Sequence, residues 1–108
     1  MKLLIFGGTT EGRVLARRLT EAGLPFTHEK NLAPGCRIDF WCGGVGIEIK
    51  KGKPKPSALL EQLRRYAVSE EIGTLVVLTQ RSVRLPAAVC GKPLVQITLN
   101  QLWGVALP

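Results

Sequence analysis

Apolar and polar positions alternate with distinct periods along the first part of the chain. Residues 2–6 form a short apolar run ended by a glycine pair, which predicts a buried strand. Residues 14–22 carry apolar side chains at helical spacing, and Gly23 ends the predicted helix; two threonines upstream offer an N-cap hydroxyl. A strand is then expected over 25–30 and a loop over 31–35.

Residues 37–50 have the pattern of a β-hairpin. Gly43 and Gly44 separate two β-rich runs, and both glycines can adopt the positive φ that a two-residue loop needs. With this loop, residues whose numbers sum to 87 lie opposite one another. One row of side chains is then apolar throughout and is expected to face the core. That row consists of Ile38, Phe40, Cys42, Val45, Ile47 and Ile49.

The remainder of the chain adds one helix and two strands. In order, the pattern predicts a basic, proline-containing loop over 51–56, a helix over 57–69 capped by Ser57, a buried strand over 74–79, a connection over 81–91 and a strand over 94–98. The resulting order, β-α-β-β-β-α-β-β, predicts an α/β domain with a mixed central sheet flanked by helices.

Composition narrows the class of protein. With 108 residues, 45% of them hydrophobic, residues 1–108 are expected to form a single globular domain. No uninterrupted apolar run exceeds four residues, so neither a membrane span nor a secretory segment is expected. Three cysteines without a CxxC motif and one histidine disfavour a zinc site or disulfide framework and fit a reducing cytoplasm. The net charge of +7 suggests a polyanionic partner such as nucleic acid, although a solvated basic surface carries the same charge.

The second row of the hairpin carries the candidate chemistry. It places Asp39 opposite Glu48, with their Cβ atoms roughly 5 Å apart, where two like charges repel. Two converging carboxylates suit a hard divalent ion such as Mg²⁺. Lys50 follows on the same face, where its ammonium can orient a water or a phosphate. Alternatively, these charges only solvate the outer face of the hairpin, with Arg37 and Lys50 neutralising the acids.

This arrangement resembles the active-site signature of the PD-(D/E)XK nuclease superfamily, in which an aspartate and an acid-x-lysine occupy adjacent strands. Asp39 and the segment 48–50 match that signature, although an isoleucine replaces the proline before the aspartate. Gln62 and Tyr66 resemble the QxxxY motif of the RecB-type branch, whose side chains position the substrate strand and the catalytic lysine. Glu11 matches the helix-borne glutamate of many members, including archaeal-type Holliday-junction resolvases.

The resemblance implies a restriction-endonuclease-like αβββαβ core with an extra N-terminal strand, and metal-dependent hydrolysis of DNA phosphodiester bonds. Asp39, Glu48 and the backbone carbonyl of Ile49 would hold Mg²⁺ or Mn²⁺, with Glu11 as an additional acid. Lys50 would hold the attacking water or the scissile phosphate. The resemblance also leaves room for a homodimer in which two sites meet two DNA strands.

Basic residues follow the expected catalytic strand and could contact DNA phosphates. They are Lys51, Lys53, Lys55, Arg64 and Arg65, with Arg81 and Arg84 later in the chain. For any one of them, simple solvation is an equally good explanation. Trp41 could stack on a base, although a strand tryptophan more often packs beneath a helix.

Two other functions fit parts of the sequence. Residues 5–13 resemble the opening of precorrin reductases, which use NADPH, and Glu29 lies where a ribose-binding acid is expected. A nucleotide-binding half needs further parallel βα units, however, whereas a tight hairpin comes next here. The third interpretation is a nuclease fold whose acids are idle and which only binds DNA.

Overall fold

The computed structural model describes residues 10–98, which contain two helices and six strands. In chain order the elements are α1 (Thr10–Glu21), β1 (Thr27–Ala33), β2 (Cys36–Cys42), β3 (Val45–Lys50), α2 (Pro56–Ala67), β4 (Thr74–Thr79), β5 (Ala88–Val89) and β6 (Lys92–Thr98). The predicted α/β class with a mixed sheet is confirmed. The strand expected over 2–6 lies outside the described residues.

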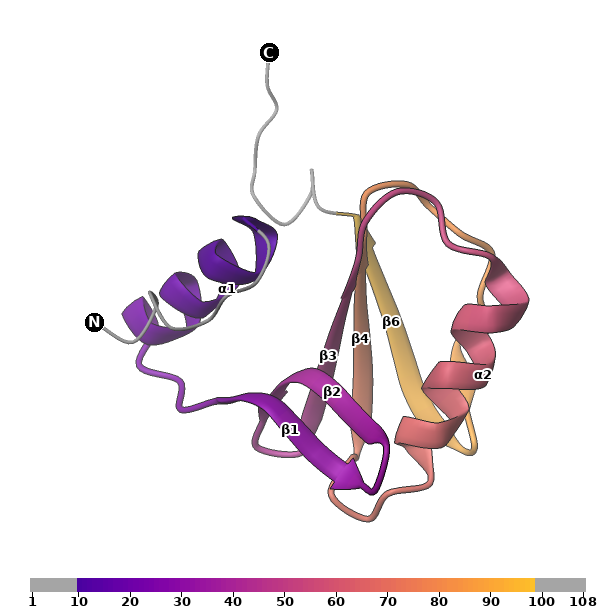
Figure 1. The fold of residues 1–108 in the computed structure, drawn as a ribbon, viewed down its shortest axis with the longest axis horizontal. Helices are drawn as coiled ribbons and strands as arrows, with labels where there is room; N and C mark the ends of the chain where they lie inside the picture. Colours follow the sequence, from indigo (N-terminus) through magenta and orange to yellow (C-terminus); the bar gives the residue numbers. More distant parts are fainter. Residues whose placement is uncertain (1–9, 99–108) are drawn as a thin grey trace.

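The six strands form one sheet in the order β1-β2-β3-β4-β6-β5. The pairs β1–β2 and β2–β3 are antiparallel, β3–β4 and β4–β6 are parallel, and β5 is antiparallel to β6. Parallel neighbours require a crossover connection, and α2 provides it between β3 and β4 (Figure 1). Neither helix within residues 10–98 combines the length and the apolar character needed to cross a bilayer.

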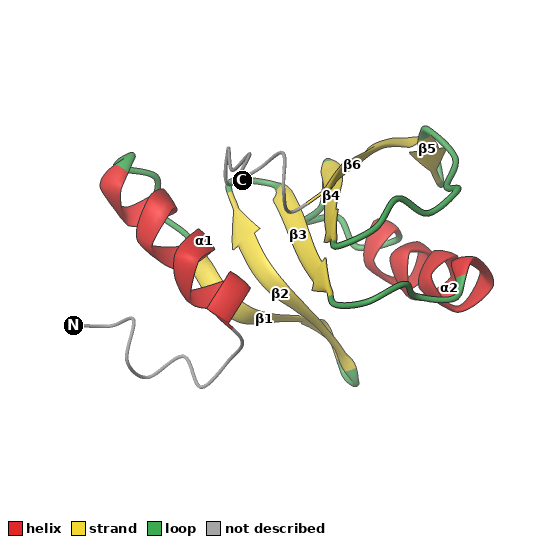
Figure 2. Ribbon diagram, turned by 90° about the horizontal axis from the view of Figure 1, so that it is seen from above, coloured by secondary structure: helices red, strands yellow, loops and turns green. Residues whose placement is uncertain are grey.

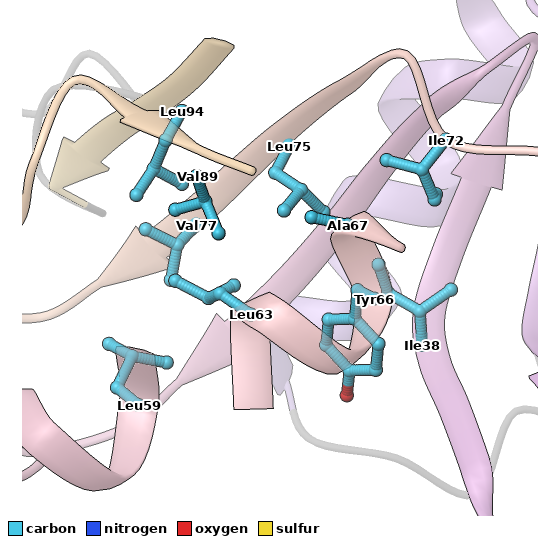
Figure 3. Packing of buried hydrophobic residues seen from close by; sticks show 10 residues of the cluster. All are labelled: Ile38, Leu59, Leu63, Tyr66, Ala67, Ile72, Leu75, Val77, Val89 and Leu94. Carbon is cyan, nitrogen blue, oxygen red and sulfur yellow. The ribbon is translucent and has the colours of Figure 1, made fainter. Parts of the chain in front are cut away.

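The two helices cover opposite faces of the sheet (Figures 1 and 2). On one face, α1 packs in a buried cluster formed by Leu15, Ala16, Phe40, Ile47 and Leu78. On the other face, α2 packs in a larger cluster, shown in Figure 3, of Ile38, Leu59, Leu63, Tyr66, Ala67, Ile72, Leu75, Val77, Val89 and Leu94. Covering both faces explains the nearly continuous apolar run of β4, because a central parallel strand has no solvent side.

Three predicted boundaries are wrong, for identifiable reasons. The first is the loop expected over 31–35, most of which belongs to β1, because Asn31 and Ala33 pair with β2. The second is the start of α2, which is not capped by Ser57: it begins at Pro56, with Lys55 as an N-cap that makes no side-chain hydrogen bond. Proline is favoured at this position since its fixed φ suits a first helical turn that needs no N–H partner.

The third difference concerns the last strands. The connection expected over 81–91 contains β5, whose two residues pair with Lys92 and Pro93, so that β6 begins two residues earlier than predicted. A β-turn at Cys90 and Gly91, both with positive φ, joins the two strands. Such a short hairpin carries little hydrophobic periodicity, which is why the sequence pattern did not reveal it.

The register predicted for the β2–β3 hairpin is confirmed near its turn. Gly43 and Gly44 have φ values of 54° and 90°, and the pairs Cys42↔Val45, Trp41↔Gly46 and Phe40↔Ile47 follow the sum of 87. The single apolar row is wrong at Ile38, because this residue is buried in the cluster under α2 whereas Phe40 is buried under α1. Alternation therefore breaks at Asp39, the residue between them.

Candidate functional site

At Asp39 the connection between β2 and β3 changes from backbone pairing to side-chain hydrogen bonds. Asp39 Oδ2 accepts the N–H of Ile49 at 2.8 Å. In the opposite direction, Glu48 Oε1 accepts the N–H of Asp39 at 3.2 Å. Each carboxylate therefore binds a backbone donor of the other strand. This exchange explains the break in alternation and fixes both acids where the two strands meet.

The environment of this pair disfavours two negative charges. Glu48 is 4% exposed, and its burial, together with the nearby Asp39 carboxylate, raises its pKa to about 7. Burial also raises the pKa of Asp39, an effect that the Ile49 N–H and the Lys50 ammonium oppose. A buried and a half-buried carboxylate, both with raised pKa values, form a site in which an added cation would favour the ionised form of each.

Lys50 lies where the hairpin pattern predicted, two residues beyond Glu48 at the end of β3. Its Nζ is 3.3 Å from Glu48 Oε2, and its side chain is 29% exposed. The ammonium therefore has one ionic contact inside the site while it remains accessible to solvent. A lysine in this position can contact an anionic group from solvent while it keeps its ion pair with Glu48.

Helix α2 contributes two side chains to the site. Gln62 Nε2 donates to Glu48 Oε2 at 3.2 Å and to the hydroxyl of Tyr66 at 2.8 Å. The hydroxyl of Tyr66 in turn donates to the carbonyl of Arg37 at 3.1 Å. Burial raises the pKa of Tyr66, which keeps this hydroxyl protonated and able to donate. The spacing of four residues places Gln62 and Tyr66 on one face of the helix and links α2 to both strands of the hairpin.

A pocket of about 170 Å³ opens beside Asp39 on the side of α1. Its lining comes from α1, from the first three strands and from the residue after β3. The lining residues are Gly12, His28, Glu29, Asp39, Phe40, Ile49 and Lys51. Asp39 and Ile49 thus face a space large enough for several water molecules, while Gln62 holds Glu48 from the side of α2.

Glu29 and His28 belong to this pocket, and sequence reasoning did not assign them to it. The β1–β2 pairs pass from His28↔Phe40 to Lys30↔Ile38, so Glu29 stands opposite Asp39 but outside the ladder. Glu29 has a φ of 55°, a conformation that costs energy for a residue other than glycine, and its charge contributes to the raised pKa of Asp39. The position of Glu29 depends on the register between β1 and β2. The sequence pattern did not predict this register, because residues 31–35 were expected to form a loop.

The structure does not bring Glu11 into the carboxylate pair. Its Oε1 lies 3.8 Å from Lys51 Nζ and is buried without a hydrogen-bond partner. Among residues 10–98, no three histidine, cysteine, aspartate or glutamate side chains form a group that could hold a metal ion. Of the acids expected to bind metal, Asp39 and Glu48 are therefore adjacent, and Glu11 is paired with a lysine of the pocket instead.

The predicted DNA-contacting residues lie in two places. Lys51, Lys53 and Lys55 follow β3 and are exposed, whereas Arg64 and Arg65 are exposed on α2. Arg64 is also 3.8 Å from Glu61, one turn away on the same helix.

Trp41 packs beneath α2, as strand tryptophans more often do. Its Nε1 donates to the carbonyl of Glu71 at 2.8 Å, and Lys30 Nζ lies 4.8 Å from its ring centroid. The ring packs against the cluster under α2. Trp41 therefore joins the hairpin to the segment before β4.

The donor set at Asp39 and Glu48 fits a magnesium or manganese ion. It offers two carboxylates, to which the predicted third ligand, the carbonyl of Ile49, would add another oxygen of the kind that hard divalent ions prefer. The raised pKa values of the two acids add an electrostatic reason for a cation at this position. Protein-family models, curated proteins and solved structures were each compared with the chain, and none of them matches it.

Proposed function

We propose that this protein is a metal-dependent nuclease that hydrolyses DNA phosphodiester bonds, with the restriction-endonuclease-like αβββαβ core of the PD-(D/E)XK superfamily. The observation that carries the proposal is the Asp39–Glu48 pair, in which Glu48 is buried and Lys50 lies 3.3 Å from it. The order of the described elements, from α1 through β4, supports the same assignment. A structural hairpin gains little from a buried glutamate whose pKa is raised by its burial and by a neighbouring aspartate, whereas a metal site needs two such acids.

Asp39, Glu48 and the carbonyl of Ile49 would hold Mg²⁺ or Mn²⁺. Such an ion would supply Lewis-acid stabilisation of the charge that develops on the scissile phosphate. The hydrogen bonds from Asp39 N–H and Gln62 keep the carboxylate of Glu48 in a single orientation. This preorganisation means that the acids need not rearrange when substrate binds.

Lys50 would contact the scissile phosphate or the attacking water. Its ammonium lies 3.3 Å from Glu48 Oε2, and its exposed fraction leaves it accessible from solvent. Gln62 and Tyr66 act as positioning residues, because they hold Glu48 and the backbone at Arg37 rather than the substrate. Catalysis would then depend on orientation and electrostatics, with no covalent intermediate.

The decisive experiment is cleavage of labelled single-stranded, duplex and four-way-junction DNA in the presence of Mg²⁺, Mn²⁺ or EDTA. We expect metal-dependent cleavage by the unmodified protein and none by Asp39→Asn or Lys50→Ala. Glu61→Gln and Arg17→Ala are matched controls, since both side chains are exposed outside the pair and neither is assigned to the DNA-binding surface. A second readout is the melting temperature, which Mn²⁺ should raise for the unmodified protein and not for Asp39→Asn.

Three other outcomes would overturn the proposal. Cleavage that survives both Asp39→Asn and Lys50→Ala would exclude this site. DNA binding at low salt without cleavage under any metal would indicate a binding module with idle acids. A melting temperature raised by NADPH, with no cleavage, would favour the reductase-like interpretation, whose glycine pair lies outside the described residues.

A further inference from the structure

Two loops leave the sheet at the carboxyl-terminal ends of the central strands β3 and β4, directly beyond the candidate site. Lys50 and Thr79 end β3 and β4 and are paired in the parallel register. Just past them, the N–H of Gly52 donates to Gln80 Oε1 at 2.6 Å, which ties the two loops together. Figure 1 shows both loops leaving the same end of the sheet and running toward α2. The loop that follows β4 therefore starts next to the candidate catalytic lysine.

Gln96 of β6 fixes this second loop. Its Oε1 accepts the N–H of Val83 at 2.7 Å, and its Nε2 donates to the carbonyl of Val83 at 2.6 Å. Oε1 also accepts the hydroxyl of Thr79 at 3.2 Å, and the side chain of Val83 is buried. With both backbone groups and the side chain of Val83 engaged, the loop has one defined course at this point. A loop ordered in advance loses less conformational entropy when it binds a partner.

Arg81 and Arg84 stand on either side of this anchor, and both are exposed. Residues 72–98 contain no aspartate or glutamate, and neither do residues 51–60. The two loops therefore bring five cationic side chains to one edge of the sheet without an acid of their own. Cationic side chains on an anchored loop and on a second loop tied to it are complementary to a phosphate backbone.

We propose that residues 80–87 form an arm for the DNA backbone, in which Arg81 and Arg84 contact phosphates that flank the bond held at Lys50. This inference rests on the proposed nuclease function and adds a second contact region to it. Gln96 is the positioning residue of the arm, since it acts through the backbone of Val83 and not on DNA. The arm extends the binding surface from Lys51, Lys53 and Lys55 to the neighbouring parallel strand.

The test is binding of fluorescent duplex DNA in EDTA, measured over a series of salt concentrations. We expect the double variant Arg81→Ala/Arg84→Ala to weaken binding about tenfold and to lower the slope of log K against log salt by about 1.8, or roughly 0.9 for each lost phosphate contact. The control is Arg13→Ala/Arg17→Ala, which removes the same charge from the exposed face of α1 and should leave the slope unchanged.

A second variant tests the anchor without a change in net charge. Gln96→Leu removes the hydrogen bonds to Val83, and we expect a loss of affinity and slope in the same direction but smaller than for the double variant. Its melting curve shows whether the sheet remains folded. A folded Gln96→Leu protein that binds DNA with the unmodified affinity would show that the arm needs no anchor, which would overturn that part of the inference.

The remaining outcomes separate the arm from the nuclease. Metal-dependent cleavage with an unchanged slope in Arg81→Ala/Arg84→Ala would overturn the arm and leave the proposed function intact. An equal loss in the α1 control would also overturn the arm, because net charge alone would then explain binding. If the unmodified protein neither binds nor cleaves DNA at low salt, the proposed function is overturned, and the arm with it.

Discussion

The two ends of the β2–β3 hairpin are held together by different interactions. Near the turn, backbone pairs join the strands from Phe40 to Cys42, and the glycines supply the positive φ values that the turn requires. At the other end, here called the open end, the carboxylates of Asp39 and Glu48 accept hydrogen bonds from backbone N–H groups of the facing strand. The turn end is explained by the alternation of apolar residues and by the glycines of the turn. The open end instead brings two carboxylates together, and neither their mutual repulsion nor the burial of Glu48 favours folding.

This difference assigns the stability of the hairpin to its turn end and its proposed activity to its open end. The turn end is filled by apolar side chains, and its stability comes from their burial. The open end gives up regular pairing and buries charge, which a sheet does not do for stability alone. The following predictions test whether stability and activity divide between the two ends in this way.

The largest expected effect comes from Asp39→Asn at the open end. The asparagine carbonyl can still accept the N–H of Ile49, so the fold keeps its hydrogen bond while the site loses a charge. We expect cleavage to fall by at least about a thousandfold, since metal stabilisation contributes several kcal/mol. The free energy of unfolding should change by less than about 1 kcal/mol or increase. A variant that unfolds instead would contradict the division between the two ends.

The next effect is a dependence of stability on pH. The pKa of Glu48 rises from 4.5 to about 7 on folding, so the folded state binds more protons than the unfolded state between these values. The contribution of Glu48 to the free energy of unfolding of the metal-free protein should therefore be largest below pH 4.5 and be lost as pH rises through 7, by about 3 kcal/mol at most. The raised pKa of Asp39 acts in the same direction.

Urea unfolding of the protein in EDTA at several pH values measures this dependence. Glu48→Gln removes the titrating group and should flatten most of the slope. Glu61→Gln is the matched control, because that glutamate is exposed on α2 and should leave the slope as it is. A slope that persists unchanged in Glu48→Gln would assign the effect to another group.

At the turn end, Gly46→Ala should reduce stability. A Cβ at this position would lie 2.6 Å from Ile38 Cδ1 and 2.7 Å from Ile72 Cδ1, both in the core under α2. Overpacking of this kind typically costs about 1–3 kcal/mol, so a clear drop in melting temperature is expected. Gly73→Ala provides the comparison, since its added Cβ would meet only the carbonyl oxygen of Gly44 at 3.8 Å.

The smallest expected effect is that of Tyr66→Phe, which removes one hydroxyl between α2 and the hairpin. The carbonyl of Arg37 loses its donor and Gln62 loses one acceptor, which should cost about 1 kcal/mol of stability. Because Gln62 still donates to Glu48, we expect cleavage to fall severalfold at most. A loss as large as that of Asp39→Asn would place Tyr66 in the chemistry instead of beside it.

Much of the secondary structure could be predicted from local features of the sequence. The helical spacing before Gly23, the glycine pair of the hairpin and the apolar run of β4 each depend on neighbouring residues alone. The relation of Glu48 to Lys50 is also local, since alternate residues of a strand share a face. Likewise, the spacing of Gln62 and Tyr66 placed them on one side of a helix.

The tertiary structure decided which of these residues meet and what lies around them. Ile38 lies on the face under α2, next to the point where the Asp39 carboxylate accepts a backbone N–H of β3, and Glu48 is buried. Glu11 paired with Lys51, and Glu29 came to stand opposite Asp39 through the register of β1. Such contacts join residues distant in the chain, so they depend on packing and register, which local periodicity does not encode.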